Sequence, residues 1–75
     1  MKTADIKPGI AYAVATFNDY DGYALRGTVM SAGGREVTVL VRVFDDIVGG
    51  DITERRTVRP KDIRETWDDY TARIA

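Results

Sequence analysis

The fold of this 75-residue chain is decided by residues 35–44, REVTVLVRVF, in which valine occupies every second position from 37 to 43. The residues between these valines are a threonine, a leucine and an arginine. Successive side chains of a β-strand point to opposite faces of the sheet, so a period of two residues is typical of a half-buried strand. The stretch therefore predicts a strand with a valine face in the core and a mixed face outside.

Three further segments have the composition of β-strands: residues 10–17 (IAYAVATF), 23–31 (YALRGTVMS) and 52–59 (ITERRTVR). Turn formers separate them, with Asn, Asp and Gly over residues 18–22 and two glycines within residues 45–51. The last segment carries charge on both faces, which is typical of a strand at the edge of a sheet. The sequence thus predicts four strands joined by short loops.

The glycine pair at 33–34 predicts a hairpin between the second and third of these strands. A three-residue loop of residues 32–34 sets Val29 opposite Val37 and keeps the apolar residues of both strands on one face. A two-residue loop over the same glycines would mix the faces, because a slip of one residue turns the side chains of a strand to the other side. We therefore expect the three-residue loop, with Gly34 in the left-handed conformation at a bulge.

Pro60 and an apolar periodicity predict a helix over residues 60–74, since proline is favoured at the first helical position. Apolar residues recur at spacings of four, three and four, which is one face of an α-helix; they are Ile63, Trp67, Tyr70 and Ile74. This face is expected to pack on the sheet or on a second copy of the chain. The aromatic residues in alternating or helical patterns are expected in the core: Tyr12, Phe17, Phe44, Trp67 and Tyr70.

Together these elements predict one small domain over residues 1–75, mainly β with one C-terminal α-helix. The strands are expected to form a small antiparallel, strongly bent sheet or an SH3-like barrel of four to five strands. A meander of this size must bury one face and protect its edges, and a bent or closed sheet does both. The barrel would span about residues 7–59 and the helix about residues 60–74.

Four short motifs carry the resemblance to SH3-like small barrels, of the KOW and Tudor kind. They are KPG at 7–9, GTV at 27–29, VTVLVRV at 37–43 and TVRPKDI at 57–63. The resemblance implies a glycine-led first strand, a hairpin, and a last strand that runs into a proline-containing turn. Residues 15–20, ATFNDY, are also similar to the ALYDY stretch of signalling SH3 domains. The paired tryptophans of those domains have no counterpart here, so binding of proline-rich peptides is not implied.

Composition argues against several classes of function. The chain has no His and no Cys, and Ser31 is its only serine, so the commonest general base, nucleophile and zinc ligands are missing. We therefore expect no enzyme, cofactor, metal or small-molecule substrate. Net charge is −1 and is evenly spread, whereas a general nucleic-acid binder normally has a basic excess.

The N-terminal residues lack the apolar core of a leader peptide, and no apolar stretch is long enough to cross a membrane. These features favour a cytoplasmic protein without membrane contact. Arg outnumbers Lys and Asp outnumbers Glu, a usage typical of a GC-rich coding sequence such as that of an actinobacterium or one of its phages.

The first candidate site is the stretch 17–27, FNDYDGYALRG. Two acids before a glycine fit part of a calcium-binding loop, but the end ligands are missing, so we interpret them, like the acids of residues 45–51, as turn formers. Tyr20, Tyr23 and Arg26 are predicted to contact a protein partner or a second copy, because Tyr and Arg are enriched at binding hot spots. In the alternative interpretation, Tyr20 covers the barrel end as a lid. The Tudor resemblance implies a third, an aromatic cage of Phe17, Tyr20 and Tyr23.

The second candidate site is a group of arginines in and near the last predicted strand: Arg42, Arg55, Arg56 and Arg59. They are candidates for contact with phosphate or with an acidic partner, although the neighbouring Glu54 also fits a solvated edge strand. We expect a small non-enzymatic interaction module or regulator that binds a protein partner or self-associates, for example as a dimer. The alternative is a nucleic-acid-binding SH3-like barrel that uses the arginine-rich fourth strand.

Overall fold

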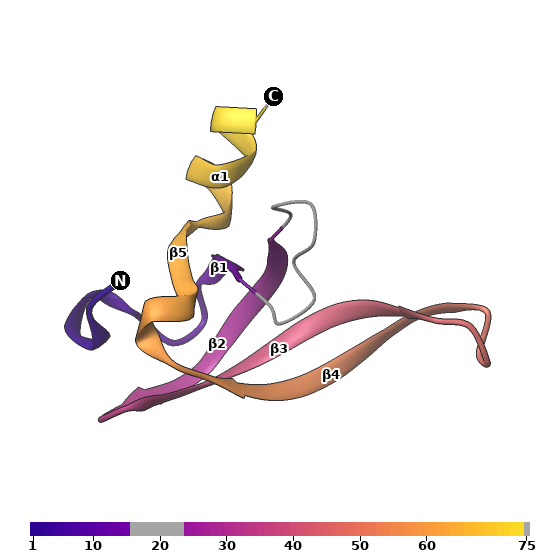
Figure 1. The fold of residues 1–75 in the computed structure, drawn as a ribbon, viewed down its shortest axis with the longest axis horizontal. Coiled ribbons are helices and arrows are strands. Elements are labelled where there is room, and N and C mark those ends of the chain that lie inside the picture. The colour runs from indigo at the N-terminus through magenta and orange to yellow at the C-terminus, as the bar shows by residue number, and fades with distance from the viewer. Residues whose placement is uncertain (16–23, 75) are drawn as a thin grey trace.

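In the computed structural model, which describes residues 1–15 and 24–74, the chain is mainly β with one helix near the C-terminus (Figure 1). Its strands are β1 (Ala11–Val14), β2 (Leu25–Gly33), β3 (Glu36–Asp45), β4 (Gly50–Val58) and β5 (Ile63–Thr66). Two short 3₁₀ turns, η1 (Thr3–Asp5) and η2 (Pro60–Asp62), and the helix α1 (Trp67–Ile74) complete the order of elements. The predicted class, mainly β with one C-terminal helix, is confirmed.

All five strands belong to a single antiparallel sheet in the order β4-β3-β2-β1-β5. The predicted antiparallel arrangement is therefore confirmed, and β5 is a strand where the sequence predicted helix. β4 and β5 stand at the two edges, and within residues 1–15 and 24–74 no pairing between them closes the sheet. The turn η2 carries the chain from one edge to the other.

The core lies on one face of this sheet and consists mostly of β-branched side chains. Fully buried are Val14, Val29, Val37, Val39, Val41 and Ile63, and Ile6 and Tyr12 belong to the same cluster. Full burial of such an aliphatic side chain is worth about 1.5–3 kcal/mol relative to leaving it exposed. The predicted valine face of β3 is thus confirmed for residues 37–41.

The hairpin between β2 and β3 has a different register from the predicted one. Val29 pairs with Val39, not with Val37, and the turn consists of Gly34 and Arg35 alone. Gly34 has a φ of +62°, so its predicted left-handed conformation is confirmed. The three-residue loop is wrong, because the extra residue lies inside β2 and not in the turn.

This extra residue forms a bulge in β2, where the register shifts between Val29 and Ser31. Without the shift, Ser31 would lie opposite Val37 on the side of the core. With it, Ala32 takes that place and packs against the core, while Ser31 is exposed. The bulge therefore buries a methyl group in place of a hydroxyl group that would need a hydrogen-bond partner.

The predicted helix over residues 60–74 is wrong in its first half. Pro60 opens the 3₁₀ turn η2, and the following residues form β5, which pairs with β1. Ile63 is completely buried opposite Val14, so a side chain assigned to a helical face belongs to the core of the sheet. The physical reason is the backbone of β1, whose polar groups on that side need hydrogen-bond partners that β5 supplies.

The helix α1 begins at Trp67, where Thr66 Oγ1 accepts a hydrogen bond of 3.2 Å from the Asp69 N–H. A side-chain oxygen at this position satisfies one of the free N–H groups of the first turn. Tyr70 is buried, as predicted, whereas Trp67 is half-buried and Ile74 is exposed. Among the described residues, no helix is long and apolar enough to span a membrane.

One part of the sheet extends beyond the rest. The pairing of β2 with β3 ends where Gly27 faces Val41, but β3 and β4 stay paired as far as Asp45 and Gly50. The two strands therefore project from the body as a hairpin that is seen on the right of Figure 1. We call residues 43–52 the arm.

Candidate functional site

The arm ends in a turn that its own side chains fix. Asp45 Oδ1 accepts hydrogen bonds from the N–H groups of Ile47 and Val48 at 2.8 and 3.0 Å. The Gly49 N–H donates to the Asp45 carbonyl at 2.8 Å, and Gly49 has a φ of +76°. Asp45 supplies a side-chain acceptor and Gly49 a positive φ, as a hairpin turn requires, which agrees with the interpretation of these residues as turn formers.

The described residues contain no group of three His, Cys, Asp or Glu side chains that could hold a metal ion. The Asp19 and Asp21 of the calcium-loop comparison lie outside the described residues. The arm carries three carboxylates, those of Asp45, Asp46 and Asp51, and no basic side chain. At its base Arg42 Nε lies 3.8 Å from Asp51 Oδ2, and both side chains are largely exposed.

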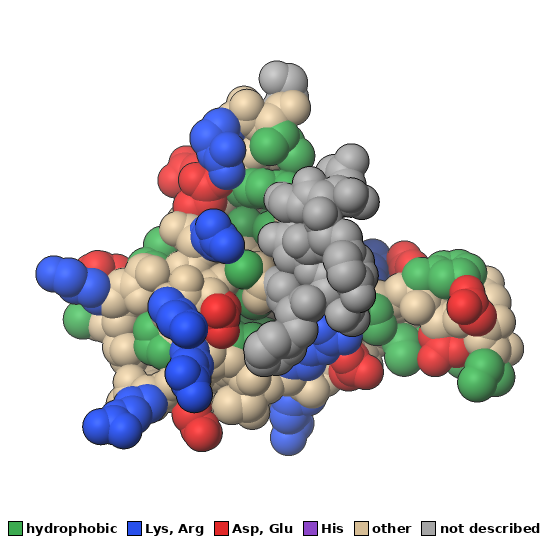
Figure 2. Space-filling model, viewed as in Figure 1, with side chains coloured by type: hydrophobic (Ala, Val, Ile, Leu, Met, Phe, Trp, Pro, Cys, Tyr) green, Lys and Arg blue, Asp and Glu red, His purple; other side chains and the backbone are tan. Residues whose placement is uncertain are grey.

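Large apolar side chains of the arm lie in solvent. Ile47 is 96% exposed, Val48 68% and Phe44 66%. The space-filling view shows hydrophobic side chains on the arm, next to acidic ones (Figure 2). The core position predicted for Phe44 is wrong, because Phe44 lies on the face of β3 opposite the buried valines and only β4 accompanies β3 at this point. The exposed apolar area of these three side chains is unfavourable by about 25 cal/mol for each Å², which makes the arm a candidate contact surface.

Sequence reasoning missed the arm as a site, although a signal was present. Ile47 and Val48 stand between two acids and two glycines, in a segment that otherwise contains only turn formers. A hairpin turn needs Asp and Gly, and it has no use for two adjacent β-branched residues. An apolar pair inside a predicted turn therefore indicates a contact surface, because the turn itself does not need these side chains.

The candidate site of residues 17–27 is described only in its last part. Phe17, Tyr20 and Tyr23 lie outside the described residues, so the contact, lid and cage interpretations all stay predictions. Arg26 is exposed on β2, opposite Ala13 of β1.

The arginine group is divided by the sheet into three environments. Arg42 and Arg55 are exposed on the outer face, opposite Thr53 and Leu40. Arg26 shares this outer face with Arg42. Gly27 and Val41 pair with each other and point to the inner face, so their neighbours Arg26 and Arg42 point to the outer face.

Arg56 and Arg59 lie elsewhere. Arg56 points to the inner face, where it is half-buried and its Nε lies 2.6 Å from Glu54 Oε2. Arg59 follows the end of β4 and lines a groove. The four arginines of the prediction therefore do not share one surface, and only the outer-face pair joins Arg26.

That groove lies at the end of the β3–β4 ribbon opposite the arm. It is open, has a volume of about 860 Å³, and is formed by residues 34–36 of the β2–β3 turn and residues 57–62 of β4 and η2. Its basic side chains are Arg35, Arg59 and Lys61, its acidic ones Glu36 and Asp62. Val58 and Pro60 contribute half-buried apolar surface. We call this region the end groove, and Figure 2 shows Lys and Arg side chains gathered at this end of the molecule.

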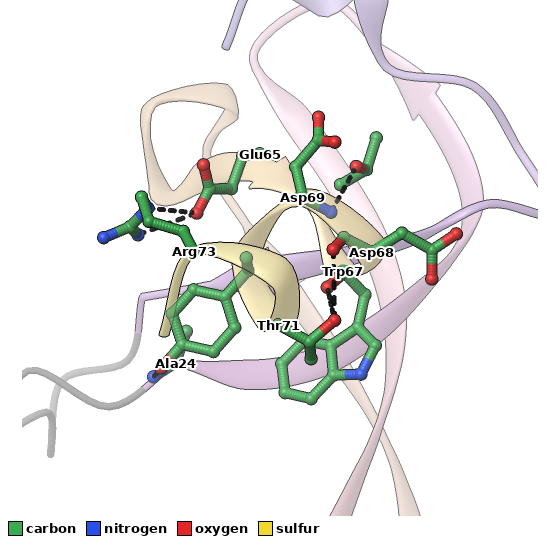
Figure 3. Close-up of polar contacts among 9 residues, drawn as sticks. Ala24, Glu65, Trp67, Asp68, Asp69, Thr71 and Arg73 are labelled. Atoms are coloured by element: carbon green, nitrogen blue, oxygen red, sulfur yellow. Dashed lines mark hydrogen bonds and ion pairs between the residues drawn. The ribbon is translucent and has the colours of Figure 1, made fainter. Parts of the chain in front are cut away.

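The helix α1 is held to the sheet by polar and aromatic contacts (Figure 3). The Tyr70 hydroxyl accepts a hydrogen bond of 3.3 Å from the Ala24 N–H, and the rings of Trp67 and Tyr70 are 5.2 Å apart. Arg73 lies over the Tyr70 ring and donates to Glu65 Oε1 at 2.7 Å. Hydrogen bonding and charge attraction from Glu65 raise the pKa of Arg73 above its ordinary value. Of these contacts, those of Tyr70 with Ala24 and of Arg73 with Glu65 join the helix to the segments beside it.

Neither a family model, nor a curated protein, nor a solved structure matches this chain.

Proposed function

We propose that this chain is a small non-enzymatic interaction module that binds a protein partner, or a second copy of itself, through the arm. The observation that carries the proposal is the exposure of Phe44, Ile47 and Val48 on a hairpin whose turn is fixed by Asp45. A fixed turn presents these side chains in one arrangement, so that little conformational entropy is lost when a partner covers them. The carboxylates around them favour a partner with basic groups.

We also propose that the sheet is strongly bent in the manner of an SH3-like barrel, as the motifs of the sequence suggest. The support is the short connection of its two edges, since only Arg59 and the turn η2 separate β4 from β5. A body of this kind holds its loops and hairpins rigidly, which suits a module that acts by contact alone. Tyr20, Tyr23 and Arg26 remain a proposed second contact surface.

A photo-crosslinking experiment tests contact through the arm. We expect benzoylphenylalanine in place of Ile47 to form covalent adducts with a polypeptide in an extract of the source cell or in a concentrated sample of the pure chain. The same group in place of Arg64, which is exposed on β5, is the matched control. Equal adducts from both positions, or none from position 47, would show that the arm is not a contact surface.

A second candidate function, nucleic-acid binding in a cytoplasmic setting, has one observation in its favour. Arg26, Arg42 and Arg55 share the outer face of β2, β3 and β4, where a phosphate backbone could meet all three. The ion pair of Arg42 with Asp51 and the net charge of −1 weigh against it. The test is retention on heparin at low salt, compared with a variant that has alanine at the three positions. Weaker retention of the variant would support this function, and equal early elution of both would contradict it.

A further inference from the structure

The β3–β4 ribbon carries two different surfaces at its two ends. At one end, the pair Asp45–Gly50 leads into the tip of the arm, and at the other, the pair Val37–Val58 borders the end groove. These pairs are eight residues apart along β3, which corresponds to about 27 Å at a rise of about 3.4 Å per residue. The ribbon is continuous between them, so the arm cannot fold back onto the end groove of its own chain (Figure 1).

The two surfaces are complementary in charge. The arm has three carboxylates and no basic side chain, whereas the end groove has three basic and two acidic side chains. Two of the three carboxylates already have partners within the chain: Asp45 accepts the hydrogen bonds of the turn, and Asp51 pairs with Arg42. One of the two acids, Asp62, already accepts a hydrogen bond from the Arg59 N–H at 3.2 Å. Within the described part of the chain, the ion pairs of 4.0 Å or less do not involve the basic side chains of the groove.

The two surfaces also match in their apolar parts. The tip of the arm presents Ile47 and Val48 in solvent, next to Asp46. The end groove offers Val58 and Pro60 between its basic side chains. A contact between tip and groove would bury apolar surface at its centre and leave the charges at its rim, which is the usual arrangement of an interface.

Resting on the proposed function of the arm, we propose that the chain assembles head to tail, with the arm of one copy lying in the end groove of the next. Contact between two arms is the symmetric alternative, and it would bring three carboxylates against three others at high cost. A head-to-tail contact uses different surfaces on the two copies, so it repeats, and it produces a closed ring or an open filament. The occupant of the groove is thus a second copy of this chain.

The size of the two surfaces sets the strength of a single contact. Three exposed apolar side chains on a narrow hairpin form a small interface, and interfaces of this kind are weak on their own. Association is therefore expected to depend strongly on concentration until a ring closes. Sedimentation velocity over a series of concentrations of the pure chain measures this, with species larger than a monomer as the expected result.

Two variants separate the two surfaces. The arm variant carries Asp46→Lys and Ile47→Ser, and the groove variant carries Arg35→Glu and Lys61→Glu; all four positions are exposed. Each variant alone is expected to associate at least about tenfold more weakly than the natural chain. An equimolar mixture is expected to form a 1:1 dimer and nothing larger, because the first keeps only its groove and the second only its arm.

Three further experiments make the result of the mixture specific to the two surfaces. Charge changes outside both surfaces, Arg64→Glu on β5 and Asp68→Lys on α1, are the matched controls and should leave association unchanged. Circular dichroism and thermal melting establish that each variant is folded. In a chain that combines Asp46→Lys with Lys61→Glu, the reversed charges meet again, and association should recover.

The outcomes that overturn the inference are distinct from those that overturn the proposed function. A natural chain that stays monomeric at every concentration, or variants that do not combine in the mixture although the natural chain associates, would rule out head-to-tail assembly. If position 47 still crosslinks to a different polypeptide, the arm remains a contact surface with another partner. If it crosslinks to nothing, the proposed function fails as well.

Discussion

The two halves of β3 follow one alternating pattern but lie in different surroundings. Val37, Val39 and Val41 are at most 1% exposed, in the part of β3 that has β2 on one side and β4 on the other. Beyond Val41 only β4 continues alongside; Val43 is half-buried, and Phe44 on the opposite face is 66% exposed.

This difference shows that a sequence pattern can predict the face on which a side chain lies without predicting whether that face is buried. Alternation specifies which side chains share a face, but the number of neighbouring elements decides whether that face is buried. The arm and the rest of the described chain, which we call the body, should therefore respond in opposite ways to substitution. Changes at buried positions of the body should lower stability, and changes at the exposed positions of the arm should alter association alone.

The largest effect is expected for Ile63→Ala in the body. Ile63 is completely buried opposite Val14, so the substitution leaves a cavity and should lower the free energy of unfolding by roughly 2–5 kcal/mol. A domain of this size has little stability in reserve, so much of the chain should be unfolded. Urea unfolding followed by circular dichroism measures the change, with Arg64→Ala on the exposed side of β5 as control. A midpoint equal to that of the control would contradict the burial of this residue.

A smaller loss is expected for Gly27→Ala, which adds a methyl group where β1, β2 and β3 meet. A Cβ at this position would lie 2.7 Å from Val14 Cγ2 and 3.3 Å from Val39 Cβ, so these side chains must move. Overpacking of this kind costs about 1–3 kcal/mol. Gly33→Ala in the same strand is the matched control, because its Cβ would meet no atom within 4 Å. Equal melting temperatures of the two variants would contradict the close packing of Val14 and Val39 around Gly27.

Tyr70→Phe should have a still smaller effect, at the junction of α1 with β2. It removes the acceptor of the Ala24 N–H and should destabilise the chain by about 0.5–1.5 kcal/mol, the net value of an ordinary hydrogen bond. Hydrogen exchange measured by NMR should become faster at the Ala24 amide, while amides in the centre of β3 should change only with global stability. Unchanged exchange at Ala24 would mean that this bond does not hold the helix.

The sequence predicts the local features of the body well and the non-local ones poorly. The strand expected at residues 35–44 is found one residue further on, because alternation is a property of the segment itself. The role of Ile63 depends on the free edge of β1, some fifty positions earlier, which no local pattern reveals. The bulge in β2 depends likewise on whether a serine or an alanine faces Val37 across the hairpin.

The candidate site also has features that a local pattern reveals and features that depend on distant parts of the chain. A period of two residues places Arg55 and Arg56 on opposite faces, so the separation of the arginine group could have been derived from the sequence. The arm could not, because it exists only where β2 stops accompanying β3, and the length of one strand does not determine that of its neighbour. The apolar pair Ile47–Val48 in a predicted turn was the one local sign of it.

The smallest effect on stability is expected in the arm itself, from the double change Ile47→Ser and Val48→Ser. Both side chains lie in solvent, and the hydrogen bonds of the turn use only their backbone N–H groups. The melting temperature should therefore stay close to that of the natural chain, since surface substitutions usually change stability by no more than about 0.5 kcal/mol. Association measured by sedimentation should nevertheless be lost, which is the opposite of the result expected for Gly27→Ala.

The comparison of these two variants decides what the exposed apolar residues of the arm are for. If the serine variant melts at a much lower temperature, the residues are covered within the chain and belong to its core after all. If it melts normally and associates normally, these side chains take no part in contact between copies of the chain. Normal melting with lost association agrees with an arm whose exposed side chains add no stability to the fold and form the contact between copies. In that case the cost of exposing Ile47 and Val48 is offset when a second copy covers them.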